Sequence, residues 1–363
     1  MITKEQIRQI LAQVSYADTG RDIISLKMVQ DLKVEGDKVS FSLIFQRADD
    51  PNIVPTKKAC VQQLEANFDK IDIRGNIAVK ILDLKANPPI FADVKNIVAI
   101  ASGKGGVGKS TVAANLAVTL AKQGYKVGLL DADIFGPSMP KMFGVEQENV
   151  SIRTVGERDL IEPVEKYGVK MLSIGFFVNP NQATVWRGPM AGNALKQMMQ
   201  DGDWGELDYL LIDLPPGTSD IHLTMVQGVS VTGAVIVSTP QDVALADAIK
   251  GIDMFESDAV NVPVLGLVEN MAWFTPEELP ENKYYIFGEG GAKRLAQDKN
   301  VSLLGEIPIV QSIRESGDMG APIALKDEHP VAEAFATVAH NIVAAINRRN
   351  QDLPPTQVVE MNN

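Results

Sequence analysis

The chain has 363 residues, of which 45% are hydrophobic and 22% charged, so it can form two domains with buried cores and is not disordered throughout. Its formal net charge of −12 argues against general nucleic-acid binding, which needs a net basic face. The single cysteine, Cys60, excludes a disulfide within the chain and favours a reducing compartment. No apolar run is long enough to span a membrane, and the N-terminus lacks the apolar core of a signal peptide. We expect a soluble cytoplasmic protein with no membrane and no nucleic-acid partner.

Residues 1–85 are predicted to form a small α/β domain. We expect helices at 4–14 and 57–68, and strands at 28–34, 39–45 and 77–82. The turn Glu35-Gly36-Asp37-Lys38 between the first two strands is typical of a hairpin. The prolines Pro88 and Pro89 break regular structure, so residues 86–95 are expected to be a linker.

The pattern changes from Val94, where short apolar runs begin to alternate with helical segments. This alternation is typical of a parallel sheet covered by helices on both faces. Residues 96–349 are therefore predicted to form a doubly wound, mostly parallel α/β domain, followed by a flexible tail at 350–363. Strands are expected at 97–101, 127–130, 169–174, 209–212, 233–237, 264–268 and 302–306, and helices at 109–123, 190–200, 243–257 and 331–347.

A phosphate-binding loop is the strongest motif. Residues 103–111 read GKGGVGKST, which fits G-x-x-x-x-G-K-[ST] in full between a strand-like run and a helical run. The glycines let backbone N–H groups wrap around phosphates, and the following helix N-terminus favours the same anions. Lys109 is expected to reach the β- and γ-phosphates of ATP, Ser110 to bind Mg²⁺, and Thr111 to lie near the α-phosphate. The predicted nucleotide contacts are Gly103, Lys104, Gly105, Gly106, Val107, Gly108, Lys109, Ser110 and Thr111.

A second lysine, Lys104, stands at the start of this loop and gives the form KGGVGKS. This form resembles the deviant Walker A group, which includes the cell-division ATPase MinD, the nitrogenase iron protein and the arsenite-pump ATPase. The resemblance implies a homodimer in which Lys104 reaches the partner's nucleotide and offsets the charge that develops on the phosphoryl group. The alternative is a solvated surface lysine.

Two acidic sites follow predicted strands, at the sheet edge where ligands bind in such folds. Asp133, in the run Asp131-Ala132-Asp133, matches the switch I aspartate of the group, which orients or deprotonates the attacking water; Asp131 is the alternative, as a structural residue or a group that contacts Mg²⁺ through water. Asp213 ends an apolar run in the Walker B arrangement, where a carboxylate holds the magnesium. Gly217, four residues later, is expected to offer its N–H to the γ-phosphate. For either aspartate the alternative is a cap or turn residue.

Weaker candidates lie nearer the C-terminus. Asn270 follows a predicted strand, and its amide could pair with adenine, while Pro308 could line the base; simple turn roles are the alternative for both. Arg187 is expected to contact a phosphate, the dimer partner or an acidic side chain. His222, His329 and His340 show no metal-ligand spacing.

Several longer segments together resemble the Mrp/ApbC family of P-loop ATPases, which act as iron–sulfur cluster carriers or scaffolds. They are IVAIASGKGGVGKSTVAANLAVTLA, GLLDADIFGPSMPKMFG, VWRGPM, LDYLLIDLPPGTSD, VENMAWF and IFGEGGAKRLA. The resemblance covers roughly residues 96–347. It implies ATP hydrolysis with Mg²⁺, a 4Fe-4S cluster as cargo, and iron–sulfur client or assembly proteins as partners. The first 85 residues resemble a small iron–sulfur assembly domain often fused to this family.

The chain departs from the family at the cluster ligands. Members carry a C-x-x-C pair shortly after the ENM segment, but residues 271–285 contain no cysteine. Iron–sulfur clusters are bound by soft thiolate ligands, usually four, and a dimer of this chain contains only two cysteines. Cys60 is expected to be a core residue, with a relocated ligand as the alternative. Two functions therefore stay open: an iron–sulfur carrier, and a nucleotide-gated adaptor or regulatory ATPase that carries no cluster. A membrane switch like MinD would need a basic amphipathic helix that the C-terminus lacks.

Overall fold

The computed structural model describes residues 2–16, 21–26, 28–45, 50–81, 90–134, 136–155, 158–177, 188–276, 278–279, 281–354 and 356. The chain divides into two compact units, residues 1–89 and 90–363. One hydrophobic cluster lies in the first unit and two lie in the second, so each unit has its own core. No helix among the described residues is both long enough and apolar enough to cross a membrane.

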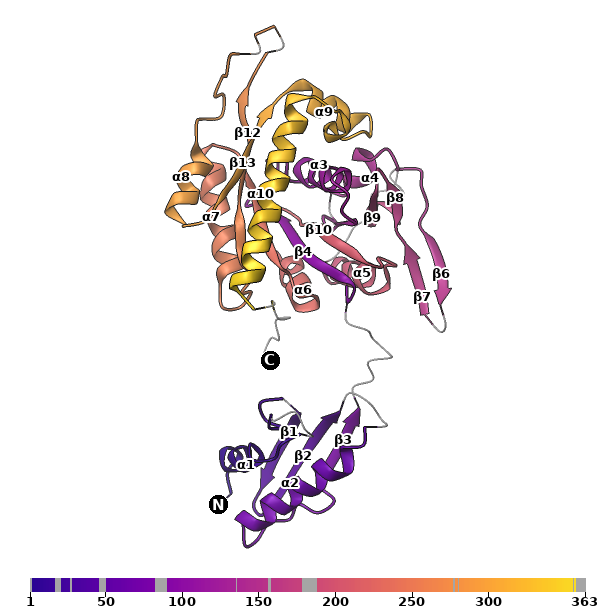
Figure 1. Cartoon of the computed structure of the whole chain (residues 1–363), viewed down its shortest axis with the longest axis vertical. Coiled ribbons are helices and arrows are strands. Elements are labelled where there is room, and N and C mark those ends of the chain that lie inside the picture. Colours follow the sequence, from indigo (N-terminus) through magenta and orange to yellow (C-terminus); the bar gives the residue numbers. More distant parts are fainter. Residues whose placement is uncertain are drawn as a thin grey trace. The chain divides into compact units, whose positions relative to one another are not determined.

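In its described residues, the smaller unit has a three-stranded sheet and two α-helices (Figure 1). Its elements are α1 (Lys4–Leu11), β1 (Val29–Glu35), β2 (Lys38–Phe45), α2 (Ile53–Asn67) and β3 (Ile77–Ile81). Strands β1 and β2 pair antiparallel up to Glu35 and Lys38, which confirms the predicted hairpin, and β3 pairs parallel to β2. Helix α2 begins four residues before the expected start. Pro55 is tolerated there because the N–H groups of a first helical turn have no intrahelical partner.

The larger unit is built on a long sheet. Its strands are β4 (Val94–Ala101), β5 (Val127–Asp131), β6 (Ser151–Val155), β7 (Arg158–Glu162), β8 (Val164–Lys166), β9 (Val169–Ser173), β10 (Leu207–Asp213), β11 (Gly233–Ser238), β12 (Val264–Phe274) and β13 (Leu303–Ile309). Its helices are α3 (Lys109–Lys122), α4 (Met139–Met142), η2 (Ile174–Phe176), α5 (Gly188–Asp201), α6 (Asp220–Gly228), α7 (Asp242–Glu256), α8 (Gly291–Asp298), α9 (Gln311–Asp318), η3 (Ile323–Leu325) and α10 (Pro330–Asp352).

The strand order β13-β12-β11-β4-β10-β5-β9-β8 places β4 inside the sheet, between β10 and β11. The strands pair in parallel except β8, which is antiparallel to β9. The predicted mostly parallel α/β sheet is confirmed. Two predicted boundaries are wrong: Val94 and Lys95 belong to β4 rather than to a linker, and α10 continues to Asp352, so the tail begins later than residue 350.

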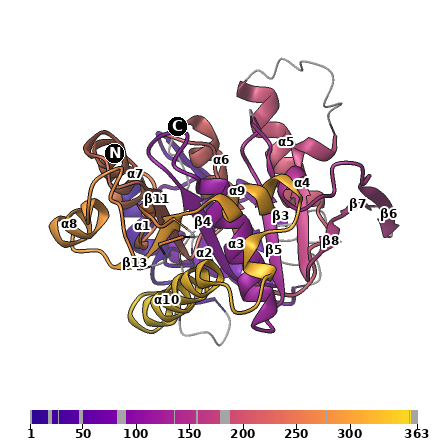
Figure 2. The same ribbon diagram turned by 90° about the horizontal axis from the view of Figure 1, so that it is seen from above.

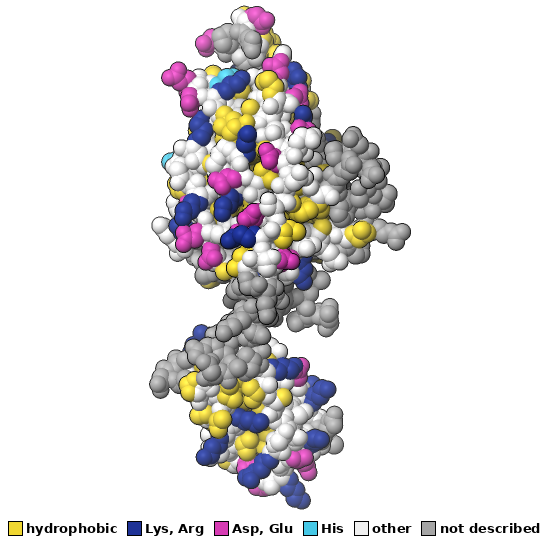
Figure 3. All heavy atoms as spheres, turned by 90° about the vertical axis from the view of Figure 1, so that its right-hand side faces the viewer, with side chains coloured by type: hydrophobic (Ala, Val, Ile, Leu, Met, Phe, Trp, Pro, Cys, Tyr) yellow, Lys and Arg dark blue, Asp and Glu magenta, His cyan; other side chains and the backbone are white. Residues whose placement is uncertain are grey.

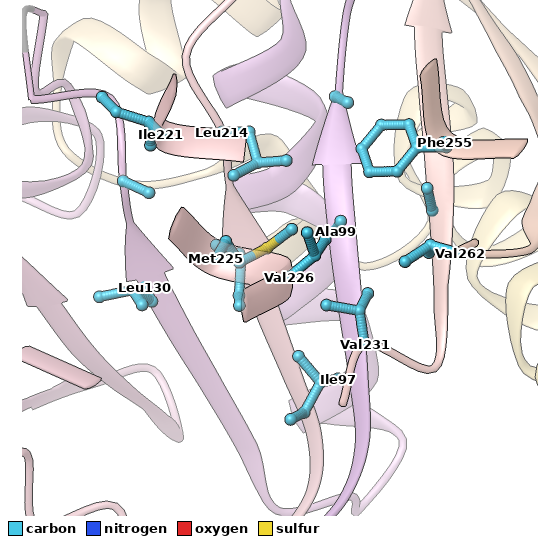
Figure 4. Packing of buried hydrophobic residues seen from close by; sticks show 14 of the residues in the cluster. Ile97, Ala99, Leu130, Leu214, Ile221, Met225, Val226, Val231, Phe255 and Val262 are labelled. Atoms are coloured by element: carbon cyan, nitrogen blue, oxygen red, sulfur yellow. The ribbon is translucent and has the colours of Figure 1, made fainter. Parts of the chain in front are cut away.

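Helices cover both faces of this sheet (Figures 1 and 2). Along β4 the side chains alternate, with Ile97, Ala99 and Ala101 in the cluster that also contains side chains of α5, α6, α7 and α8. Val98 and Ile100 belong to the cluster on the other face, with α3 and α10. Figure 4 shows side chains of α6 pointing toward β4 in the first cluster. A strand buried on both faces must be apolar throughout, as residues 97–101 are.

Three features of the larger unit escape the sequence pattern. Strand β12 runs to Phe274 instead of ending at Val268, and a bridge joins Phe274 to Tyr284 beyond it. The sequence pattern also does not predict the helices α6, α8 and α9 or the β6–β7 hairpin. On the face drawn in Figure 3, the basic side chains of the larger unit are mixed with acidic ones.

Candidate nucleotide site

The candidate site lies where three neighbouring strands end. β10 lies between β4 and β5, and residue 213 pairs with both residue 100 and residue 131. The loop 102–108 leaves β4 and leads into α3, whose first residue is Lys109. Because parallel strands end at the same edge, this register brings the phosphate loop, Asp131 and Asp213 together.

Lys109 and Asp213 form the centre of the site. Lys109 Nζ lies 2.7 Å from Asp213 Oδ1 and 3.8 Å from Asp133 Oδ2. Ser110 Oγ donates to Asp213 Oδ2 at 2.7 Å. The Lys109 side chain is 5% exposed and that of Asp213 0%, so this is a buried ion pair. The residues predicted for phosphate, magnesium and water are therefore within contact distance of one another.

Burial opposes the charged form of these carboxyl groups. It raises the pKa of Asp213, while the Lys109 ammonium and the hydrogen bonds from Lys109 and Ser110 lower it. The pKa of Asp133 is also raised by burial, and Lys109 again opposes the rise. The lysine is thus the first group that opposes burial and favours the charged form of both carboxyl groups.

Asp131 is fully buried and does not contact Lys109. Its Oδ2 accepts hydrogen bonds from Ser173 Oγ at 2.8 Å and from the Met139 N–H at 3.3 Å, and its Oδ1 accepts from the Asp133 N–H at 3.2 Å. Burial, with a further contribution from the nearby Asp213 charge, raises the pKa of Asp131 to about 7. Of its two predicted roles, these contacts correspond to the structural one.

Asn270 touches the phosphate loop directly. It lies on β12, is 6% exposed, and its Nδ2 donates to the carbonyl of Val107 at 2.8 Å. A Cβ added to Gly108, whose φ is +81°, would lie 2.2 Å from that Nδ2. Glycine at 108 is therefore required by both the backbone conformation and the space. Since this amide nitrogen already holds the loop, pairing of Asn270 with adenine stays a prediction.

Gly217 and Pro308 are both close to these elements. The N–H of Gly217 donates to the carbonyl of Ser102 at 2.8 Å, so it must leave that partner before it can bind a γ-phosphate. Pro308 is buried inside β13, which extends past the expected end at 306. Its neighbour Ile307 pairs with Asn270 across the two strands. The structure thus brings Pro308 and Asn270 to neighbouring strands.

The remaining candidates are Lys104, Arg187 and the histidines. Lys104 is half-buried, and among the described residues it forms no ion pair. Arg187 lies outside the described residues. His222 is buried in α6, where its Nδ1 accepts from the Ser219 N–H at 3.1 Å, and His329 caps α10. In the described parts of the chain, no group of three or more His, Cys, Asp or Glu side chains could hold a metal ion.

Cys60 belongs to the core of the smaller unit. Its side chain is 0% exposed, and burial raises the pKa of the thiol to about 12. The thiolate is the form that binds metals, so this sulfur is a poor ligand. The predicted core position of Cys60 agrees with the structure.

Sequence reasoning missed Ser173, which ends β9 and contacts Asp131 across the sheet. A serine at the end of an apolar strand carries little signal by itself. Only the strand order β10-β5-β9 shows that it lies beside Asp131.

The comparisons with known proteins follow the same division of the chain. The family model for a "NUBPL iron-transfer P-loop NTPase" matches residues 93–343, which is more than half of the chain. The chain belongs to this family of P-loop NTPases. A second family model, described as an iron–sulfur cluster assembly protein, matches residues 4–68 in the smaller unit. Both agree with the resemblances that the motifs predicted.

Individual relatives extend over one or both units. An iron–sulfur cluster carrier protein from a Synechocystis strain is 40% identical over 354 residues, covering 96% of this chain and 99% of its own. A carrier protein of the same description from Aquifex aeolicus is 53% identical over 252 residues, covering 68% of this chain and 66% of its own. A solved nucleotide-binding protein from Archaeoglobus fulgidus, in complex with ADP, is 41% identical with a TM-score of 0.58, covering 70% of this chain and 95% of that chain.

Proposed function

We propose that this protein binds and hydrolyses ATP with Mg²⁺ and acts in iron–sulfur cluster assembly as a cytoplasmic homodimer. The observation that carries the ATPase proposal is the buried contact of Lys109 and Ser110 with Asp213, beside Asp133. The assembly function is supported by the family and by the described relatives, which are iron–sulfur cluster carrier proteins. The ADP in the Archaeoglobus protein supports an adenine nucleotide as the ligand.

The donor set fits magnesium. The Ser110 hydroxyl and the Asp213 carboxylate supply hard oxygen ligands 2.7 Å from each other, and Mg²⁺ prefers oxygen. When bound, the ion would neutralise charge on the transferring phosphate. Lys109 would then exchange its contact with Asp213 for the nucleotide phosphates.

The other residues divide the remaining work. The N–H groups of loop 103–108 bind the phosphates, and Asp133 orients the attacking water. Gly217 releases the Ser102 carbonyl and donates to the γ-phosphate, so that the loop after β10 senses the nucleotide state. Lys104 of a second copy completes the charge around that phosphate.

Cluster binding by this chain's own cysteine does not fit the structure. Cys60 is fully buried with a raised pKa, and residues 271–285 supply no thiol. A carrier would need ligands lent by a client protein. This observation favours a second candidate, a nucleotide-gated adaptor that positions assembly proteins without holding the cluster.

The experiment that tests the ATPase proposal measures ATP turnover of the intact chain and of Lys109→Ala at several Mg²⁺ concentrations. We expect Mg²⁺-dependent turnover that Lys109→Ala loses. If purified intact protein binds ATP but does not hydrolyse it with any Mg²⁺ concentration, the proposed activity is wrong.

Anaerobic reconstitution with iron and sulfide distinguishes an iron–sulfur carrier from an adaptor that holds no cluster. Bound iron, bound sulfide and visible absorbance are measured on the intact chain and on Cys60→Ala. A stoichiometric cluster in the intact chain that Cys60→Ala loses would support carriage through this thiol. If neither form holds a cluster while both hydrolyse ATP, the adaptor becomes the better account.

A further inference from the structure

We propose that Asp131 and Ser173 are positioning residues that hold Asp133 in place for ATP hydrolysis, through hydrogen bonds to the backbone of the loop after β5. The inference rests on the proposed ATPase activity and extends it to two residues at the ends of neighbouring strands. It assigns Asp131 to the loop that carries Asp133 rather than to the metal.

The Asp131 carboxylate binds the loop at two separated points. One oxygen accepts from the N–H of Asp133, two residues later, and the other accepts from the N–H of Met139, at the start of α4. Asp131 itself is fixed because it ends β5, which pairs with β10 on one side and β9 on the other. A fixed carboxylate that holds both ends of a loop limits where Asp133 can point.

Ser173 fixes the direction of that carboxylate. Its hydroxyl donates to Asp131 Oδ2 at 2.8 Å and accepts from the Gly175 N–H at 3.0 Å, so the rotation of the hydroxyl is determined from both sides. Both Ser173 and Asp131 are 0% exposed. Water therefore cannot replace the serine as a donor without a local rearrangement.

The position of Asp133 decides what these contacts achieve. Its carboxylate lies 3.8 Å from the Nζ of Lys109, the lysine proposed to bind the phosphates. A displacement of about 1 Å at a catalytic group can cost roughly 100-fold in rate, while ground-state binding changes little. Loss of the hydrogen bonds made by Asp131 and Ser173 should therefore lower kcat and leave nucleotide binding nearly intact.

The test compares Ser173→Ala and Asp131→Asn with the intact chain for kcat, KM for ATP, and the Mg²⁺ concentration for half-maximal rate. We expect kcat to fall about tenfold in Ser173→Ala and further in Asp131→Asn, with KM and the Mg²⁺ requirement within about threefold. Ser173→Ala is the more diagnostic variant, because it leaves the Asp131 carboxylate in place and removes only the hydroxyl that fixes its direction. Ser316→Ala, which removes a hydroxyl from an equally buried serine of α9, is the matched control and should keep full turnover.

Amide hydrogen exchange on the same full-length variants gives a second readout. The N–H groups of Asp133 and Met139 should exchange about tenfold faster in Ser173→Ala, and those of α9 should not. This measurement does not depend on turnover. If the intact chain fails to hydrolyse ATP, the proposed function is wrong, but the exchange rates still test whether Ser173 and Asp131 hold the loop.

Two results would overturn the inference. Unchanged exchange at Asp133 and Met139 in Ser173→Ala would show that the serine does not hold the loop. A raised Mg²⁺ requirement with unchanged kcat at saturating Mg²⁺ in Asp131→Asn would assign Asp131 to the metal.

Discussion

At the residue scale, the buried ion pair of Lys109 and Asp213 links the charge balance of the site to the stability of the fold. The Lys109 ammonium is the first cause that opposes the burial-driven rise in the pKa of Asp213. A carboxylate that loses its cation inside a protein is costly, because neither water nor another charge compensates it. The pair therefore contains the lysine proposed to bind phosphate, and it also determines the stability of the nucleotide-free protein.

Lys109→Ala should destabilise the nucleotide-free protein by about 3–5 kcal/mol at neutral pH. Without the lysine, the folded-state pKa of Asp213 rises further above its unfolded value. A raised carboxyl pKa gives stability that is present at low pH and is lost as pH rises through the folded-state pKa, so the deficit should grow with pH. Urea unfolding at pH 5 and pH 8 checks this.

The double variant Lys109→Ala with Asp213→Asn provides the control. It removes both charges, so it should recover much of the stability that Lys109→Ala loses at pH 8. Equal deficits for Lys109→Ala at both pH values would contradict the account.

His222 gives stability its own pH dependence. Burial lowers the pKa of this imidazole from 6.5 to about 4, and its Nδ1 accepts the Ser219 N–H at the start of α6. The unfolded chain therefore binds more protons between pH 6.5 and 4, and folding stability should fall by up to about 3 kcal/mol as pH drops through that range. His222→Gln can still accept the same N–H and does not titrate, so denaturant unfolding of this variant should show a shallower pH slope.

At the scale of elements, β12 contacts the phosphate loop although it lies far from the motif in the sequence. Asn270 holds the Val107 carbonyl, and Gly108 must lack a Cβ for this contact to form. Near the end of the same strand, the ring of Trp273 lies 3.8 Å below the Nζ of Lys283, a residue beyond β12, and Phe274 forms a bridge with Tyr284. The same strand therefore contacts both the phosphate loop, through Asn270, and the segment around Tyr284, through Phe274.

Gly106 and Gly108 have the same backbone conformation, so substituting each in turn separates the cost of backbone strain from the cost of a clash with Asn270. Gly106 has φ +82° and open space where a Cβ would lie, whereas Gly108 has φ +81° and the Asn270 amide 2.2 Å from that position. Gly106→Ala should cost about 1–2 kcal/mol of unfolding free energy from backbone strain alone, and Gly108→Ala clearly more. Thermal and denaturant unfolding without nucleotide measure both; equal losses would mean that Asn270 moves aside freely.

The sequence predicts the parts of the site that are local in the chain and misses those made by the sheet. The phosphate loop, Asp133 and Asp213 are recognisable because each follows its own apolar strand. Ser173 and the bond between Asn270 and Val107, 163 residues apart, depend on strand order and register. β12 passes its expected end at two buried polar residues, where Asn270 donates to the loop and one carboxylate oxygen of Glu269 accepts from the Ala292 N–H at the start of α8. From the sequence alone, where these partners are unknown, two polar residues after an apolar run predict the end of a strand.

At the scale of the whole molecule, the two units have separate cores. Cys60 is buried entirely within the cluster of the first unit, and no residue of the second unit belongs to that cluster. The thiol therefore reports the opening of residues 1–89 and not the state of the nucleotide site.

Labelling of Cys60 by a thiol reagent should be slow in the native protein and fast once the first unit unfolds. Because the units have independent cores, saturating ATP should protect the second unit against denaturant and leave the Cys60 labelling midpoint unchanged. Tryptophan fluorescence follows the second unit in the same samples, since Trp186, Trp204 and Trp273 all lie beyond residue 90. A shift of the Cys60 midpoint with ATP would show that the two units unfold as one.

The interior place of β4 has a consequence for synthesis of the chain. This strand opens the larger unit, yet its two neighbours, β10 and β11, are made more than a hundred residues later. On the ribosome, residues 94–101 must wait as an unpaired apolar segment, a species prone to aggregate. The dependence of the phosphate loop on late strands should make the nascent larger unit a client for chaperones, and should make its folding slow relative to that of the smaller unit.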